Sequence, residues 1–351
     1  MMNNQSEIKK DTNTVSFKEK VRTKVTEFQM NWNDPTNKRV RNKKIGQTSG
    51  GILRTLLLIG LCFVILLPLL QKFSYAFRHP NDITDPQVIW IPGTFSTETI
   101  RIALGYLSYS ESLKNSLVLS AVTTVIQVLA TAVAGYSFAR LKFPGSNIIF
   151  YIVIFTLVVP NETLDLSRFL FYSNSPFFGL QLVYNTFSIY IMSAFGMGLR
   201  SAIFIFLFRQ SFRNVPLELE ESAEIDGAGV IRTFWSVMLP NARGSIVTVS
   251  LFAFVWQYND YYFAHLFRYE RTIPLLTTKL AAGSGSLAAV MVTSFGELLQ
   301  NLGEDIKDDP LFFGLITNTA ALLMMLPLLI SYFFVQKLFV ESIERSGLTG
   351  M

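Results

Sequence analysis

The 351-residue chain is poor in charge, cysteine and histidine. Only 16% of its residues are charged, half are apolar and 31 are Phe, whereas a soluble domain is about 25% charged. This balance indicates that lipid is the solvent for much of the chain. The single cysteine, Cys62, excludes a disulfide framework. His79 and His265 are too few and too isolated for a metal site.

Sequences typical of catalysis are also missing. No G-x-x-x-x-G-K-[ST] stretch occurs, so we expect the chain to bind no nucleotide or other cofactor itself. We find no Ser/His/Asp or paired-carboxylate arrangement in a pocket context. The chain is therefore expected to be a non-catalytic subunit.

Positive charge is concentrated at the start of the chain. Residues 1–54 hold twelve Lys or Arg and five Asp or Glu, a net charge of +7, and the remainder carries −2. A basic head before the first apolar run indicates retention in the cytoplasm. Because it lacks interleaved aromatic residues, we expect no nucleic-acid binding. Residues 1–50 are predicted to be a cytoplasmic, partly disordered segment with little order over 1–45.

Six apolar segments are long enough to cross a bilayer as helices, which takes about 20 residues each. The sequence thus predicts an all-α membrane protein with a six-span region over residues 51–340. Residues 341–351 then form a short tail. The predicted spans lie at about 53–77, 113–139, 147–170, 184–210, 244–267 and 311–338.

The distribution of Lys and Arg orients these spans. The connection "ARLKFPGSN" contains Arg140 and Lys142 and no acidic residue, so we place it inside with the basic head. Six spans then leave both termini and the 211–243 connection in the cytoplasm. By parity, the connections at 78–112, 171–183 and 268–310 are external loops.

The cytoplasmic connection at 214–240 has an unusual sequence, with "ELEESAEIDGAGVIRTFWSVMLP" at 218–240. Pro216 suits the first turn of a helix, and the acidic residues that follow favour the positive helix N-terminus. Asp226-Gly227 predicts the helix end, and Pro240 is expected to stop a second short helix at about 230–238. A helix lying on lipid is the alternative, but such helices are usually rich in Lys and Arg. We therefore expect this pair to pack on the spans or to fit a groove on another protein.

The same residues resemble the EAA loop of ATP-binding-cassette importer permeases, whose pattern is E-A-A-x-x-x-G followed by I-x-L-P. Other blocks are similar to carbohydrate-uptake permeases related to the MalG-type subunit of the maltose importer: "NSLVLSAVTTVIQVLATAVAGYSFARLKFPG", "VWQYNDYYFAHL" with "TIPL", and "LLMMLPLLISYFFVQKLFV". The resemblance covers about residues 50–350. It implies a type I importer permease fold with a cytoplasmic coupling-helix loop. The residues it assigns to ATPase coupling are Glu221, Ser222, Ala223, Asp226, Gly227, Leu239 and Pro240.

This resemblance also implies partners and a location. They are a MalF-like partner permease, two cytoplasmic ATPase subunits that bind ATP and Mg, a solute-binding protein outside, and a carbohydrate substrate, expected to be an oligosaccharide. The chain would be a multi-pass protein of the bacterial cell (inner) membrane. The 268–310 loop would contact the binding protein, with Gly283 and Gly285 giving its tip mobility. An ordinary flexible loop explains these glycines equally well.

Substrate-path candidates come from two stretches. In the second span, Asn115 and Gln127 are amides that need partners, and Tyr136 is a weaker candidate. Ordinary helix packing is at least as good an explanation for each of them. In "WQYNDYY", aromatic faces suit sugar rings and polar groups suit hydroxyls, although an interfacial aromatic belt is the favoured explanation. These residues are Trp256, Tyr258, Asn259 and Asp260.

Two other functions stay open at this point. A stand-alone secondary transporter or channel would usually show repeats and broken helices with acidic residues at mid-membrane, and we see no convincing repeat. A structural or signalling membrane protein could carry 214–240 as a general interaction helix.

Overall fold

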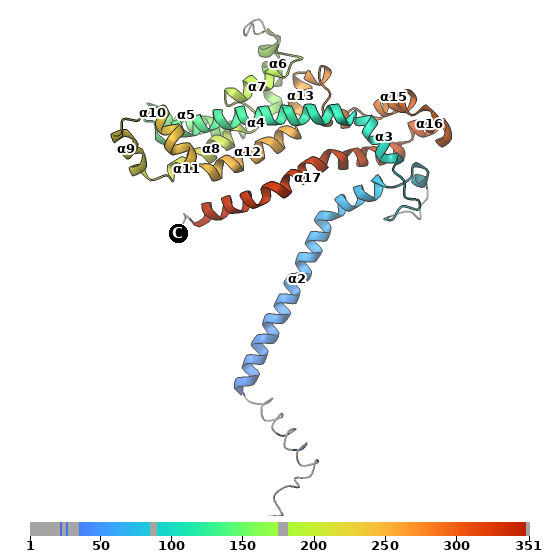
Figure 1. Ribbon diagram of the computed structural model, residues 1–351, viewed down its shortest axis with the longest axis horizontal. Helices are drawn as coiled ribbons and strands as arrows, with labels where there is room; N and C mark the ends of the chain where they lie inside the picture. Colours follow the sequence, from blue (N-terminus) through green and yellow to red (C-terminus); the bar gives the residue numbers. More distant parts are fainter. Residues whose placement is uncertain (1–21, 23–25, 27–34, 85–89, 175–181, 349–351) are drawn as a thin grey trace, which may run out of the picture. The chain divides into compact units, whose positions relative to one another are not determined.

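The computed structural model describes residues 22, 26, 35–84, 90–174 and 182–348, and these residues are mostly helical (Figure 1). An isolated bridge between Arg78 and Phe95 is the only strand-like pairing in the described part of the chain. The predicted all-α class is confirmed. The chain divides into two compact units, residues 1–70 and 71–351.

The first unit contains most of helix α2 (Pro35–Ala76). Its Gly50–Ala76 part is long and apolar enough to cross a membrane, and its most apolar stretch buries no side chain in the protein. Leu57 and Ile65 are each 65% exposed. Leucine-rich exposure of this kind suits contact with lipid tails, in agreement with the first predicted span. The expected lack of order over 1–45 falls mostly outside the described residues, and its residues 35–45 are helical.

Helices α4 (Tyr109–Arg140) and α17 (Pro310–Leu348) agree with the second and sixth predicted spans. Together with α2, they are the three helices of the described chain that are long and apolar enough to cross a membrane. A bent pair, Val230–Asn241 with Arg243–Tyr258, would make a fourth span if it is counted as one. Because α17 continues to Leu348, the predicted tail at 341–351 is largely a continuation of this helix.

The other predicted spans are interrupted, which corrects their expected form as single helices. The third divides into α5 (Ser146–Phe155) and α6 (Asp165–Asn174), with Pro160 and a 3₁₀ turn (η2, Asn161–Leu164) between them. Hydropathy does not predict such breaks, because it depends on the number of apolar residues. It takes no account of the backbone N–H group that proline lacks.

The fourth and fifth predicted spans break in the same way. The fourth divides into α7 (Phe187–Ala194) and α8 (Ser201–Arg213), with positive φ at Gly196 and Arg200. The fifth divides into α12 (Arg243–Tyr258) and α13 (Tyr262–Leu266).

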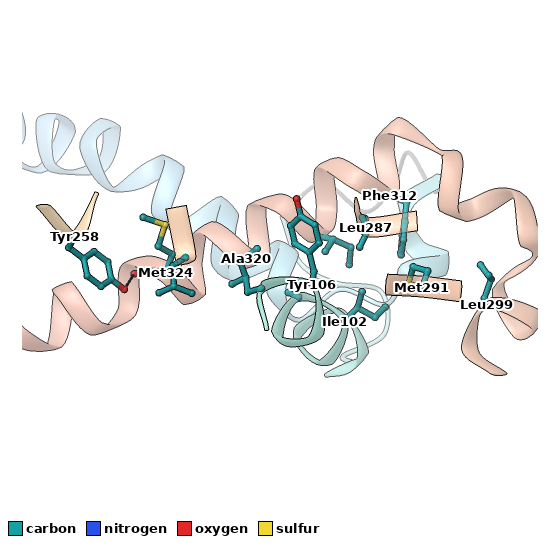
Figure 2. Packing of buried hydrophobic residues seen from close by; sticks show 13 residues of the cluster. Ile102, Tyr106, Tyr258, Leu287, Met291, Leu299, Phe312, Ala320 and Met324 are labelled. Atoms are coloured by element: carbon teal, nitrogen blue, oxygen red, sulfur yellow. Dashed lines mark hydrogen bonds between the residues drawn. The ribbon is translucent and has the colours of Figure 1, made fainter. Parts of the chain in front are cut away.

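Residues 268–310 are short helices in place of the predicted loop, and the predicted 78–112 connection contains α3 (Glu98–Leu107). Buried residues of α3, the 268–310 helices and α17 form one core cluster, which includes Ile102, Tyr106, Leu287, Met291 and Phe312 (Figure 2). The segment therefore has its own apolar packing. Its elements are η5 (Tyr269–Arg271), α14 (Leu276–Leu280), α15 (Ser284–Ser294), α16 (Gly296–Leu302) and η6 (Glu304–Asp308).

Helix α4 packs along α8, α12 and α7 (Figure 1). Its buried residues are largely Ser, Thr, Ala and Gly. Small residues of this kind allow helix backbones to approach closely. At Gly135 of α4, an added Cβ atom would lie 2.5 Å from Cβ of Phe208 and 3.0 Å from N of Arg209, both in α8.

Candidate functional site

The 214–240 loop, here called the coupling loop, is a chain of four short helical elements between α8 and α12. They are α9 (Leu217–Ile225), α10 (Val230–Thr233), the π-helical turn η4 (Phe234–Met238) and α11 (Leu239–Asn241). The predicted helix, turn and second helix are all present.

The acidic start of α9 suits the helix N-terminus. Pro216 precedes the first helical residue, and Glu218 and Glu220 lie in the first turn. Because no side chain caps this end, the carboxylates are the groups that complement the positive end of the helix dipole.

Gly227 ends α9 through its left-handed backbone, with φ +78°. The Gly227 N–H donates to the carbonyl of Glu224 at 2.9 Å, and the Ala228 N–H donates to that of Ala223 at 2.9 Å. These two bonds make a Schellman motif, in which glycine is the favoured left-handed residue. The predicted turn at Asp226-Gly227 is therefore confirmed.

Pro240 does not stop the second helix, contrary to prediction. It lies within α11, and the helical path turns two residues later, with an 81° bend between Val230–Asn241 and Arg243–Tyr258. A proline removes one backbone donor and crowds the carbonyl four residues before it, here that of Ser236. The preceding π turn contains that residue. Its wider winding accommodates the proline without ending the helix.

One face of the coupling loop is exposed and mixes acidic with apolar side chains. Glu221, Ser222 and Asp226 are exposed, whereas Ala223 and Leu239 are half-buried. Large apolar side chains accompany them, and several are more than half exposed. Exposed apolar side chains beside acidic ones are typical of a surface that another protein covers. These side chains are Leu217 (52%), Ile225 (86%), Val230 (53%), Ile231 (77%) and Trp235 (52%).

The opposite face of the loop is anchored to the bundle through Glu220. Its Oε1 accepts a hydrogen bond from the Tyr136 hydroxyl at 3.0 Å. Its Oε2 lies 3.3 Å from Nε of Arg140, an ion pair that lacks hydrogen-bond geometry. The side chains of Glu220 and Arg140 are each only 12% exposed. Glu220 was not among the predicted site residues, although Tyr136 and Arg140 are one helical turn apart and can meet the same partner.

Apolar packing reinforces the anchor. Phe234 and Met238 of the π turn are buried against Tyr136 and Phe212. The Tyr136 ring lies 5.3 Å from that of Phe234 and 5.8 Å from that of Phe212. Tyr136 therefore lies under the coupling loop, and this placement does not support its predicted role in lining a substrate path.

The two amides singled out in α4 both have backbone partners. Nδ2 of Asn115 donates to the carbonyl of Pro274 at 3.1 Å. Nε2 of the buried Gln127 donates to the carbonyl of Leu199 at 2.7 Å and to Oγ of Ser201 at 2.9 Å. These bonds hold α4 to the breaks in neighbouring segments, so the structure gives both amides a packing role.

Some of residues 256–260 are packed inside the protein and others are exposed. Trp256 stacks on Phe204 and Phe252, and Tyr258 is buried, with its hydroxyl bonded to the carbonyl of Met324 at 3.0 Å (Figure 2). Asn259 is exposed.

Asp260 is 7% exposed and accepts hydrogen bonds from the Phe263 N–H and the Tyr269 hydroxyl, at 3.2 and 3.4 Å. It thus ties α13 to η5. Within this stretch, Asn259 is the polar side chain that faces outward.

The predicted mobile tip at Gly283 and Gly285 is the beginning of helix α15. Gly283 precedes the first helical residue with φ +82°, and Gly285 lies in the first turn. Leu287 and Met291 of the same helix are fully buried. The glycines therefore stand at a folded helix end. In the described residues, no group of three or more His, Cys, Asp or Glu side chains is placed to hold a metal ion.

Comparison with known proteins gives one family match. Residues 127–345 match the family described as binding-protein-dependent transport system inner membrane component. This segment includes the coupling loop and most of the helices that contact α4.

Individual relatives are consistent with that match. The chain is 26% identical to the maltodextrin transport system permease protein MalD of Streptococcus pneumoniae, over 84% of this chain and 94% of the relative. It is 30% identical to the trehalose transport system permease protein SugB of Mycobacterium tuberculosis, over 56% and 68% of the two chains.

A solved structure is similar in fold. It is a chain from a bacterial ABC transporter involved in the import of the acidic polysaccharide alginate, matched with a TM-score of 0.62 and 23% identity. The match covers 83% of this chain and 97% of the other.

Proposed function

The chain belongs to the family of binding-protein-dependent transport inner membrane components, and from this premise we propose that it is the permease subunit of an ATP-driven carbohydrate importer. The observation that carries the proposal is the coupling loop, which has an exposed acidic and apolar face and an opposite face fixed to the bundle. A loop with this construction can bind another protein and pass its movement to the helices. The substrate class rests on the relatives named for maltodextrin and trehalose transport, and an oligosaccharide is the expected cargo.

The proposed assembly places the coupling loop in the cytoplasm. Two ATPase subunits would bind ATP and Mg there, while a MalF-like permease would complete the path. A solute-binding protein would deliver substrate from outside. In the proposed six-crossing arrangement, α2, α4 and α17 are uninterrupted crossings and the interrupted segments supply the others. Both chain ends would then be cytoplasmic in a bacterial cell membrane.

Glu221 is proposed as the main polar contact to the ATPase, because it is exposed on α9 among apolar side chains. We expect Glu221→Lys to abolish co-purification of the ATPase while the permease still inserts into the membrane. Charge reversal replaces an attraction to a basic groove by repulsion, and like charges in contact cost several kcal/mol. The assay is affinity purification of the tagged permease from membranes, with immunoblotting for the ATPase.

Lys114→Glu, a charge reversal at an exposed position on α4, is the matched control for expression and insertion. Wild-type levels of ATPase on the Glu221→Lys permease would contradict the assigned contact. Uptake driven by an ion gradient in ATP-free vesicles would instead support the stand-alone transporter.

A further inference from the structure

Glu220 and Glu221 are adjacent in α9 but differ in their surroundings. Successive residues of an α-helix are about 100° apart around its axis, so one carboxylate faces the bundle and the other is exposed. Glu220 is 12% exposed and contacts Tyr136 and Arg140, whereas Glu221 is exposed. An acidic pair in one turn thus has two separate roles.

Helix α9 depends on this contact because it has no apolar anchor of its own. None of its residues is buried, and Leu217 and Ile225 at its two ends are more than half exposed. The apolar anchors of the coupling loop come later, at Phe234 and Met238. Within the described residues, the side-chain hydrogen bond and the ion pair that join α9 to α4 are both made by Glu220.

Arg140 extends the connection to a third element. Its Nη2 donates to the carbonyl of Phe212 at 2.9 Å and also to that of Val215. These carbonyls lie at the end of α8 and at the start of the coupling loop. One guanidinium thus joins the ends of α4 and α8 to the carboxylate of α9. Such partly buried, charge-assisted contacts are screened by salt much less than exposed ones.

We propose that Glu220 is a positioning residue, which makes α9 and the end of α4 move as one body when the partner ATPase moves. The inference rests on the proposed function and adds to it a division of labour, in which Glu221 binds the ATPase and Glu220 transmits the movement. Loss of the Glu220 carboxylate then uncouples α9 from α4 without removing the ATPase.

The test uses the full transporter complex in liposomes. Nitroxides at Val133→Cys and Glu224→Cys, both exposed positions on α4 and α9, are introduced in a Cys62→Ser background. Their distance is measured by pulsed electron resonance with and without Mg-ATP and vanadate, which trap the ATPase. In the otherwise unmodified complex we expect one narrow distance that trapping does not change.

Glu220→Gln keeps an oxygen for the Tyr136 hydroxyl but removes the charge that faces Arg140. We expect it to retain the ATPase, to broaden the distance distribution and to shift it on trapping. Glu218→Gln is the matched control, because Glu218 is an exposed carboxylate in the same first turn. It loses the same interaction with the helix dipole and should leave the distance narrow and unchanged.

The outcomes separate the two proposals. If the ATPase is retained and Glu220→Gln gives the same distances as Glu218→Gln, the positioning role is wrong while the proposed function stands. The positioning role is also refuted if Glu220→Gln lowers the thermal unfolding midpoint but leaves the distances between the nitroxides unchanged. In that case Glu220 only stabilises the fold. Failure of the unmodified permease to retain any ATPase overturns both.

Discussion

The backbone at Gly227 sets where the coupling loop turns. Its φ of +78° costs an L-residue about 1–2 kcal/mol, while a Cβ atom there would meet no other atom within 4 Å. Gly227→Ala should therefore change the direction of the turn through backbone strain alone, without a steric clash. We expect this change to reorient the exposed face of the coupling loop and to reduce both ATPase co-purification and uptake. Gly229→Ala is the control, because Gly229 has an ordinary extended backbone, φ −77°, and open space around it. Equal ATPase recovery from the two variants would contradict this account.

Single residues differ in how far sequence alone could assign them. The turn at Gly227 was predictable, because local backbone preferences determine it. The role of Glu220 was not, since four other acidic residues lie in the same stretch of sequence. Only tertiary packing decides which of them faces Tyr136. The same limit explains Gln127, whose amide was correctly expected to have a partner, although its partners lie more than 70 residues away.

The contact between helices α4 and α8 depends on a missing side chain. At Gly135, an added methyl group would lie 2.5 Å from Cβ of Phe208, so Gly135→Ala must push the helices apart. Overpacking of this kind costs about 1–3 kcal/mol. We expect a lower thermal unfolding midpoint for the Gly135→Ala permease in detergent. The midpoint is measured by size-exclusion chromatography of samples heated to a series of temperatures. The matched change is Gly314→Ala in α17, where a Cβ atom meets nothing within 4 Å. A midpoint unchanged by Gly135→Ala would show that the helices adjust freely.

Uninterrupted helices were easier to predict than interrupted ones. Apolar length located α4 and the apolar parts of α2 (Gly50–Ala76) and α17 (Pro310–Lys337) to within a few residues. It failed between 147 and 210, where Pro160 and the left-handed residues at 196 and 200 break the helices. The segment at 268–310 also escaped prediction as helix. Its apolar residues bury against α3 and α17, which are distant in the sequence.

At the scale of the whole molecule, the proposed function requires the coupling loop and the 268–310 helices to lie on opposite sides of the membrane. Helix α12, which has 16 residues, lies between them in the sequence. At 1.5 Å per residue, this helix is about 24 Å long, which is less than the hydrocarbon thickness of about 30 Å. A single crossing between Ile225 and Ser284 therefore needs residues beyond α12, and α13 (Tyr262–Leu266) follows it in the sequence.

Cysteine labelling tests this arrangement directly. In a Cys62→Ser background, Ser284→Cys should react with a membrane-impermeant maleimide in intact cells, because Ser284 is exposed at the start of α15. Ile225→Cys, 86% exposed in the coupling loop, should react only after permeabilisation. Because an ATPase would cover that position, Lys142→Cys serves as a second inside site away from the loop. Labelling of Ser284→Cys and Lys142→Cys from the same side would require an even number of crossings between them and would refute the six-crossing topology.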